Sequence, residues 1–332
     1  MRFINKAGAL QSRIIAGLLS FFVILSCCGC AGLPYSVEYG SLKIGSYDSM
    51  VDSAEKAPAF ASDLCVVTED VLGDGEINLY DCESAVLFDI TNKKVVYSKN
   101  ALERLYPASL TKIMTALVAI KHGQPDQVLT ASDAVNIHET GAQLAGIVPG
   151  DSMTLYQALR ILLLYSANDV AQLIAENIGG SVDGFVAMMN EEAICLGATN
   201  THFTNPHGLT NEEHYTTAYD LYLIFNECIK YEDFTEIIQL SSFDASYKDK
   251  RGNEVYLPVK NTNGYMNGSY NPPTNVTVLG GKTGTTTAAG SCLILLSKDV
   301  NGMPFISVVL KADGSEALYS EMNKLLDVMD DE

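Results

Sequence analysis

The chain is organised around Tyr106-Pro107-Ala108-Ser109-Leu110-Thr111-Lys112, which runs on into the apolar segment 113–120. Pro107 fixes its own φ and suits the first turn of a helix, and Gly123 is a suitable stop, so we expect Ser109 at a helix N-terminus. Lys112 lies one turn further along the same face, where its amine can reach the Ser109 oxygen. The stretch therefore offers a nucleophile and a base from one rigid element.

By itself Ser-x-x-Lys is a weak signal, because many helices have serine as a cap and lysine on a solvated face. Residues 113–120 are almost entirely apolar, which is typical of a helix buried on most sides. A lysine at the start of a buried helix is costly unless it is used or paired. The motif therefore requires partners elsewhere in the chain.

Composition narrows the classes of function. With 332 residues, 47% of them hydrophobic, the chain can bury one large core or two modest ones. It carries 21 Lys and Arg against 40 Asp and Glu, and three of the basic residues lie in the first thirty. We therefore expect no nucleic-acid partner, and no electrostatic adhesion of the folded body to an anionic membrane.

The first thirty residues have the layout of an export signal. Arg2, Lys6 and Arg13 are followed by the twelve-residue apolar run 14–25, which is short for a membrane-spanning helix. We therefore expect residues 1–30 to be a signal peptide and the protein to be exported.

The end of this signal permits lipid attachment. Ile24-Leu25-Ser26-Cys27 resembles the processing box of bacterial lipoproteins, in which cleavage exposes a cysteine, and Cys30 after Gly29 is a second candidate. Ordinary cleavage near Ala31 and an uncleaved anchor stay open as alternatives. The protein is then expected on the outer face of a bacterial cytoplasmic membrane, or secreted, with membrane contact only through the N-terminus.

The remaining cysteines support neither a metal site nor a full disulfide framework. They are Cys65, Cys82, Cys195, Cys228 and Cys292, an odd number with no C-x-x-C spacing. The last three lie among apolar neighbours and are expected to be small core residues. A bridge between Cys65 and Cys82 stays open.

The chain divides into a tether and a folded body. Residues 31–79 are rich in Ser, Gly, Asp, Glu and Ala without a sustained period, which predicts a flexible tether. Residues 80–332 are expected to form the folded domain. Within it the patterns predict strands over 85–90, 95–98, 255–259, 276–285, 291–296 and 305–310, and helices from Ser109 and over 154–165, 169–177, 182–196, 217–228 and 315–329.

This order of elements predicts an α+β fold. The N-terminal hairpin and the three C-terminal strands are expected to form one antiparallel sheet, and the last helix covers one of its faces. The middle of the chain is expected to form an all-helical second lobe.

Two further motifs supply the partners that the first one requires. Ser166-Ala167-Asn168 lies in a break between two apolar helices, where helix capping is the simpler explanation for polar residues. Lys282-Thr283-Gly284 follows a strand and is flanked by glycines, so this backbone can approach a ligand closely. It is not a phosphate loop, because Val276 stands where that motif needs glycine and a strand follows instead of a helix.

Ser-x-x-Lys, Ser-x-Asn and Lys-Thr-Gly in this order resemble the signature of the penicillin-recognising serine enzymes. The finer resemblance, over about residues 80–330, is to the D-alanyl-D-alanine carboxypeptidases, the low-molecular-weight penicillin-binding proteins. It implies a β-lactamase/transpeptidase-like fold, peptidoglycan stem peptides as substrate, acylation by β-lactam antibiotics, and no cofactor. The residues that carry it are Tyr106-Pro107-Ala108-Ser109-Leu110-Thr111-Lys112-Ile113-Met114-Thr115, Ser166-Ala167-Asn168-Asp169, Asn205-Pro206-His207-Gly208-Leu209, Gly281-Lys282-Thr283-Gly284-Thr285 and Ala289-Gly290.

The resemblance implies roles for the first two motifs. Ser109 attacks the carbonyl of the penultimate D-Ala, and Lys112, neutral through burial and a neighbouring cation, acts as base. Ser166 relays a proton to the departing amine, and Asn168 orients Lys112 and the substrate amide. His207 is expected to have a structural role.

It also implies roles for the third motif. Lys282, Thr283, Gly284 and Thr285 form the substrate-binding strand, on which the cation and the hydroxyls hold the terminal carboxylate. The backbone N–H groups of Ser109 and Thr285 form an oxyanion hole.

Three other functions stay open on the same fold. A β-lactamase shares the motifs, but the Glu-x-x-Leu-Asn pattern expected of it is missing, since Glu191 and Glu192 are followed by other residues. A penicillin-binding sensor would be expected to carry transmembrane helices and a signalling domain. Transpeptidation, in which an amine replaces water, is the third.

Overall fold

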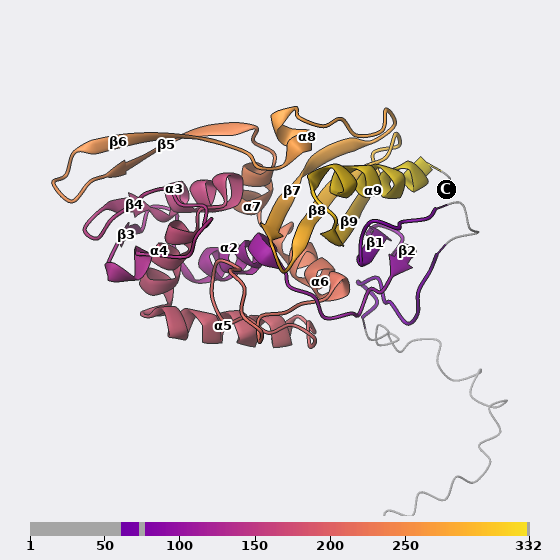
Figure 1. Ribbon diagram of the computed structural model, residues 1–332, viewed down its shortest axis with the longest axis horizontal. Helices are drawn as coiled ribbons and strands as arrows, with labels where there is room; N and C mark the ends of the chain where they lie inside the picture. The colour runs from indigo at the N-terminus through magenta and orange to yellow at the C-terminus, as the bar shows by residue number, and fades with distance from the viewer. Residues whose placement is uncertain (1–60, 73–76, 331–332) are drawn as a thin grey trace, which may run out of the picture. The chain divides into compact units, whose positions relative to one another are not determined.

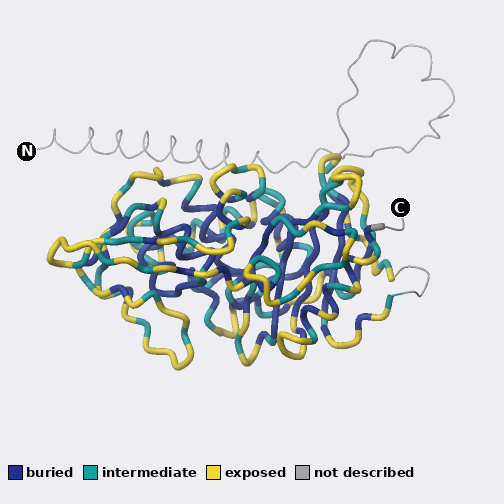
Figure 2. The backbone as a smooth tube through the Cα atoms, turned by 90° about the horizontal axis from the view of Figure 1, so that it is seen from above, coloured by how far each residue is buried: buried dark blue, intermediate teal, exposed yellow. Residues whose placement is uncertain are grey.

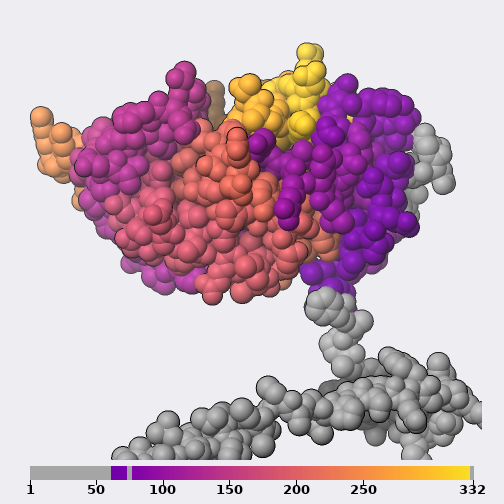
Figure 3. All heavy atoms as spheres, turned by 60° about the horizontal axis from the view of Figure 1, so that its bottom comes forward, coloured from indigo at the N-terminus to yellow at the C-terminus, as the bar shows by residue number. Residues whose placement is uncertain are grey.

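The computed structural model describes residues 61–72 and 77–330, and within them the predicted main sheet is confirmed. It has five strands in the order β2-β1-β9-β8-β7, and every neighbouring pair is antiparallel. The pairing of β1 with β9 brings the two ends of the described chain together, as the indigo and yellow regions of Figures 1 and 3 show. The strands are β1 (Ser84–Asp89), β2 (Lys94–Lys99), β7 (Thr277–Thr286), β8 (Gly290–Lys298) and β9 (Pro304–Ala312).

The sheet is buried on both faces, because alternate residues of its central strands enter two different cores. In β8, Leu293 and Leu295 face one core and Ile294 and Leu296 the other. Helix α9 (Ser315–Asp327) covers the first face with the predicted stripe of Leu318, Met322 and Leu325, and lies along the sheet in Figure 1. The other face packs against the helical lobe.

The helical lobe is built around α2 (Thr111–His122), whose residues from Thr111 to Ala119 are all buried (Figure 2). The predicted helix over 154–165 is α-helical only as far as Arg160 and then continues as a π-helix. The helix Glu232–Ile238 was not predicted. Around α2 lie α3 (Leu155–Arg160), the π-helix η4 (Ile161–Tyr165), α4 (Asn168–Gly179), α5 (Val182–Cys195), α6 (Ala218–Cys228) and α7 (Glu232–Ile238).

This lobe also carries a second sheet, so our prediction of an all-helical lobe was incomplete. Its four strands have the order β3-β4-β5-β6. Two of them have only three residues and β5 is half polar, so neither has a clear period-2 signal. The predicted strand at 255–259 pairs in this sheet and not in the main one. The strands are β3 (Val128–Thr130), β4 (Ser152–Thr154), β5 (Ser242–Lys248) and β6 (Glu254–Lys260).

The folded body begins before residue 80, which corrects the boundary that we placed at the end of the tether. Cys65 is fully buried; its N–H donates to the Tyr222 hydroxyl at 2.9 Å and its carbonyl accepts from Tyr219 Oη at 3.0 Å. Val71 forms an isolated bridge with Ser98 of β2. A few apolar residues in a polar segment thus suffice to fix it. The predicted signal peptide, the lipid-attachment candidates and the tether up to residue 60 lie outside the described residues.

The cysteines resolve two of our expectations. Cys65 and Cys82 are both free, so no bridge joins them. Cys228 and Cys292 are buried as predicted, but Cys195 is exposed. It lies off the buried stripe of α5, which Phe185, Met189 and Ala193 form at four-residue intervals; apolar neighbours in sequence did not identify the buried face.

Two absences hold for residues 61–72 and 77–330. None of the helices in this part of the chain has the length and apolar content needed to cross a membrane. No three His, Cys, Asp or Glu side chains there are grouped so that they hold a metal ion.

Candidate active site

Ser109 lies in a 3-10 turn, η2 (Ala108–Leu110), that leads directly into α2. The turn is strained, because Ala108 before the nucleophile has φ of 47°. Two contacts hold it: Thr111 Oγ1 donates to the Ala108 carbonyl at 2.8 Å, and Gly208 packs on the same carbonyl. A Cβ at position 208 would lie 1.8 Å from that oxygen, so only glycine fits there.

Lys112 is fully buried and has three oxygen partners. Its Nζ lies 2.9 Å from Ser109 Oγ, 2.6 Å from Asn168 Oδ1 and 2.7 Å from the His207 carbonyl. Burial, and next the charge of Lys282, lower the pKa of Lys112 well below its usual value, while Asp169 acts in the opposite direction. The amine is therefore held in contact with the nucleophile in a setting that favours its neutral form.

Ser166 is placed by the end of the π-helix. It has φ of 67°, a left-handed conformation between η4 and α4, and its Oγ accepts from Lys282 Nζ at 2.9 Å. A π-turn adds a residue to the helix, a local irregularity common at functional sites. Lys282 also donates to the Thr283 carbonyl at 2.7 Å, and burial lowers its pKa to about 7.

β7 brings the third motif to the nucleophile. It is an edge strand of the main sheet, so alternate backbone groups are left for a ligand. Gly284 lies against the Ser109 turn, where a Cβ would be 2.9 Å from the Ser109 nitrogen. The Thr283 hydroxyl lies 2.6 Å from that of Thr262. All the residues predicted for the site, from Ser109 to Thr285, therefore meet in one place.

Two grooves join at Ser109. The loop-side groove, of 690 Å³, is lined by Asn168, Leu209, Thr210 and the turn 285–288. The α9-side groove, of 620 Å³, is lined by Ser166, Thr262, Thr283 and Tyr319. Gln143 lines both grooves.

Sequence reasoning missed the loop that carries Gln143. The buried Asp169 carboxylate holds this loop by accepting N–H bonds from Ala145 at 2.9 Å, Gly146 at 2.8 Å and Ile147 at 3.3 Å. The Asn168 N–H donates to the Gln143 carbonyl at 2.8 Å. The residue after Ser-x-Asn thus fixes one wall of the site, although nothing in the loop's own sequence signals it.

Two buried histidines support the site. The His207 carbonyl binds Lys112, in line with the structural role expected for that loop. His214 Nδ1 accepts the Thr204 N–H at 3.1 Å, so Nε2 carries the proton and donates to Thr111 Oγ1 at 2.8 Å. Burial, and next the neighbouring charge, lower the pKa of each imidazole to about 3, so both are neutral near pH 7.

Comparisons with known proteins agree with this geometry. Residues 76–314 match the family described as D-alanyl-D-alanine carboxypeptidase. The chain is 36% identical to the D-alanyl-D-alanine carboxypeptidase DacF of Bacillus subtilis over 75% of its own length and 62% of the relative's. It is 34% identical to DacC of Escherichia coli over 74% of this chain and 60% of that one, so it spans about three fifths of the length of these relatives.

Solved structures give the same picture. The Streptomyces K15 DD-transpeptidase has a TM-score of 0.68 and 28% identity, with 79% of this chain and 98% of that chain covered. A D-alanyl-D-alanine carboxypeptidase from Mycobacterium tuberculosis has a TM-score of 0.67 and 28% identity over 78% of this chain and 95% of that chain. These similarities confirm the predicted fold class.

Proposed function

Because the chain belongs to the D-alanyl-D-alanine carboxypeptidase family, we propose that it removes the terminal D-Ala from peptidoglycan pentapeptide stems through an acyl-enzyme on Ser109. The observation that carries this proposal is the environment of Lys112. A neutral amine has two N–H groups and one lone pair. Asn168 Oδ1 and the His207 carbonyl can only accept hydrogen bonds, so they take both N–H groups. The lone pair is left for the Ser109 hydroxyl.

In the first step Lys112 removes the hydroxyl proton as Ser109 Oγ attacks the carbonyl of the penultimate D-Ala. The negative charge that develops on the carbonyl oxygen is stabilised by the backbone N–H groups of Ser109 and Thr285. Losing one donor of such a pair typically costs about 3 kcal/mol of transition-state stabilisation. Asn168 orients both Lys112 and the substrate amide.

In the second step the C–N bond breaks and the departing amine takes a proton from Lys112 through Ser166. Lys282, Thr283 and Thr285 hold the carboxylate of the leaving residue. Because the pKa of Lys282 is about 7, a bound carboxylate favours its charged form and thereby pairs with it. Water then hydrolyses the ester and regenerates Ser109. β-Lactam antibiotics are expected to acylate the same oxygen.

The proposal extends to the place where the protein works. Family members act on the cell wall, and the first thirty residues have the layout of an export signal. We place the catalytic body outside the cytoplasmic membrane, with lipid attachment at Cys27 or Cys30 and residues 31–60 as a tether. Mass spectrometry of the membrane-extracted chain tests this, since a diacylglyceryl group on either cysteine has a defined mass.

The activity is tested on the full chain, on Ser109→Ala and on Ser242→Ala, an exposed serine of β5 as matched control. Intact mass is measured after incubation with benzylpenicillin, and D-Ala release is measured from diacetyl-L-Lys-D-Ala-D-Ala. A lasting penicilloyl adduct and D-Ala release, both lost only in Ser109→Ala, are the expected result. Rapid penicillin turnover without an adduct would identify a β-lactamase, and an adduct without D-Ala release a sensor or a transpeptidase.

A further inference from the structure

The two grooves at Ser109 have different partners for a substrate. Ser166 and Thr283 line the α9-side groove and are absent from the lining of the loop-side groove, whereas Asn168 lines only the latter. On the proposed function, the departing amine faces Ser166 and its carboxylate faces Lys282 and Thr283. The leaving residue therefore occupies the α9-side groove, and the acyl chain lies in the loop-side groove.

The α9-side groove is much larger than its expected occupant. Its volume of 620 Å³ is within the range of cavities that bind drug-sized ligands, and it nearly equals the 690 Å³ of the groove for the stem peptide. A leaving D-Ala has only a methyl side chain. Most of the groove beyond Thr283 is therefore not needed to release D-Ala.

The far wall of this groove is fixed and uncharged. The rings of Tyr270 and Tyr319 stack at 3.8 Å with an interplanar angle of 13°, and Tyr319 Oη accepts the Gly264 N–H at 2.6 Å. Leu318 and the hydroxyls of Ser269 and Ser315 complete the wall, and no Asp, Glu, Lys or Arg lines the groove. Lys282, bonded to Ser166, supplies one positive charge for one carboxylate. The groove thus fits a leaving residue with a single carboxylate and a large neutral side chain.

We infer that the protein also cleaves amides in which the leaving residue is larger than alanine, such as a diamino acid whose side chain is amide-linked to a second stem at a cross-link. This endopeptidase activity rests on the proposed function and uses the same chemistry. Ser109 Oγ forms an ester with the D-Ala carbonyl, the C–N bond to the large residue breaks, and its amine takes the proton removed from Ser109. Water then cleaves the ester.

The test compares three peptides on the full chain, all beginning with diacetyl-L-Lys-D-Ala and ending in D-Ala, in Nε-acetyl-D-Lys or in D-Lys. We expect kcat/KM for the acetylated residue to lie within about threefold of that for D-Ala, and the free ammonium to lower it by about tenfold. Release of D-Ala with a loss of about 100-fold or more for the acetylated residue would overturn the inference and leave the carboxypeptidase intact. Equal rates for the two lysine peptides would contradict a groove for neutral side chains.

Variants of the groove provide a second test. Ser269→Trp and Ser315→Trp add bulk from different segments of the wall, and Ser242→Trp is the matched control on β5, outside both grooves. Each groove variant is expected to lower the ratio of acetyl-lysine release to D-Ala release by about tenfold, with the ratio unchanged in Ser242→Trp. An unchanged ratio in both groove variants would place the leaving residue elsewhere. If none of the peptides is cleaved, the proposed function fails and the inference fails with it.

Discussion

At the scale of the residue, the site places two lysines in opposite charge states close together. Lys112 has to be neutral to act as base, whereas Lys282 has to be charged to hold a carboxylate. Burial lowers the pKa of Lys282 to about 7, so its positive charge is lost as the pH rises through that value. The pKa of Lys112 is lowered further by the charge of Lys282. The working pH range therefore lies between the two pKa values.

This arrangement predicts a fall in kcat/KM for D-Ala release above about pH 7, because kcat/KM reports the ionisation of the free enzyme. In Lys282→Arg the guanidinium stays charged, so the fall at high pH should disappear although the maximum drops by about tenfold. A pH–rate profile of both proteins checks this. A fall at the same pH in the variant would assign it to another group.

His214 gives a second prediction at this scale. The imidazole is neutral in the folded protein because burial, and next the charge of His202, lower its pKa from 6.5 to about 3. Below pH 6.5 the unfolded chain binds a proton there that the native protein does not, so stability falls as the pH decreases. His214→Gln retains a donor for Thr111 and removes the titration. Its free energy of unfolding should change less steeply between pH 4 and 6, by about 1.4 kcal/mol per pH unit, in urea titrations. Equal slopes would contradict the buried neutral imidazole.

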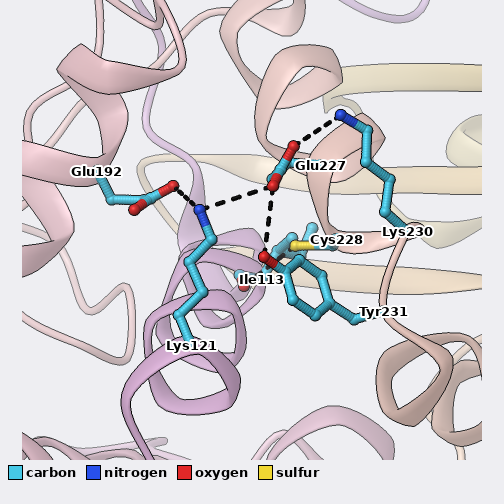
Figure 4. Close-up of polar contacts among 7 residues, drawn as sticks. All are labelled: Ile113, Lys121, Glu192, Glu227, Cys228, Lys230 and Tyr231. Carbon is cyan, nitrogen blue, oxygen red and sulfur yellow. Dashed lines mark hydrogen bonds and ion pairs between the residues drawn. The ribbon is translucent and has the colours of Figure 1, made fainter.

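At the scale of the element, the position of α2 determines the position of the nucleophile, and a charge network fixes its far end (Figure 4). Lys121 in its last turn lies 2.6 Å from Glu192 of α5 and 3.6 Å from Glu227 of α6, and Glu227 also pairs with Lys230 at 2.8 Å. Burial alone would raise the pKa of Glu227, but Lys230 and Lys121 together lower it. The stabilisation is therefore present above the usual carboxylate pKa and is lost as the pH falls.

Lys121→Met should accordingly destabilise the protein by about 1 kcal/mol at neutral pH, since it leaves two carboxylates facing each other. Lys230→Met is the matched control: its side chain is 63% exposed, and its loss should cost less than about 0.5 kcal/mol. Urea denaturation at low and high salt separates the two, because screening should shrink the larger effect. Equal costs would mean that the link between the helices contributes nothing.

Elements with strong local signals were the ones that the sequence allowed us to predict. The hairpin β1–β2, the buried helix α2 and the stripe of α9 have clear periods, and the three motifs lie within elements of this kind. β3 and β4 have three residues each, too few for a period. The Asp169 bonds to the loop at 145–147 join residues more than twenty positions apart, and no local pattern announces them. What was missed depends on tertiary contacts.

At the scale of the whole molecule, the body depends on a segment that precedes its first strand. Cys65, Val67 and Leu79 are buried, and the Cys65 backbone satisfies the hydroxyls of Tyr219 and Tyr222 on α6. Burying one such apolar side chain stabilises by about 1.5–3 kcal/mol. Removing the segment also leaves the buried Tyr222 hydroxyl without its partner, which costs about 1–3 kcal/mol more.

A chain that begins at residue 80 should therefore be at least about 3 kcal/mol less stable than one that begins at residue 59, the start of the compact unit. The chain from residue 59 keeps every buried contact of the segment and should match the full chain. The free energy of unfolding from urea titrations of the three chains measures this directly. Equal stability of the chains from 59 and 80 would mean that residues 61–79 rest on the body without stabilising it, and Tyr222→Phe in both chains would then show no difference either.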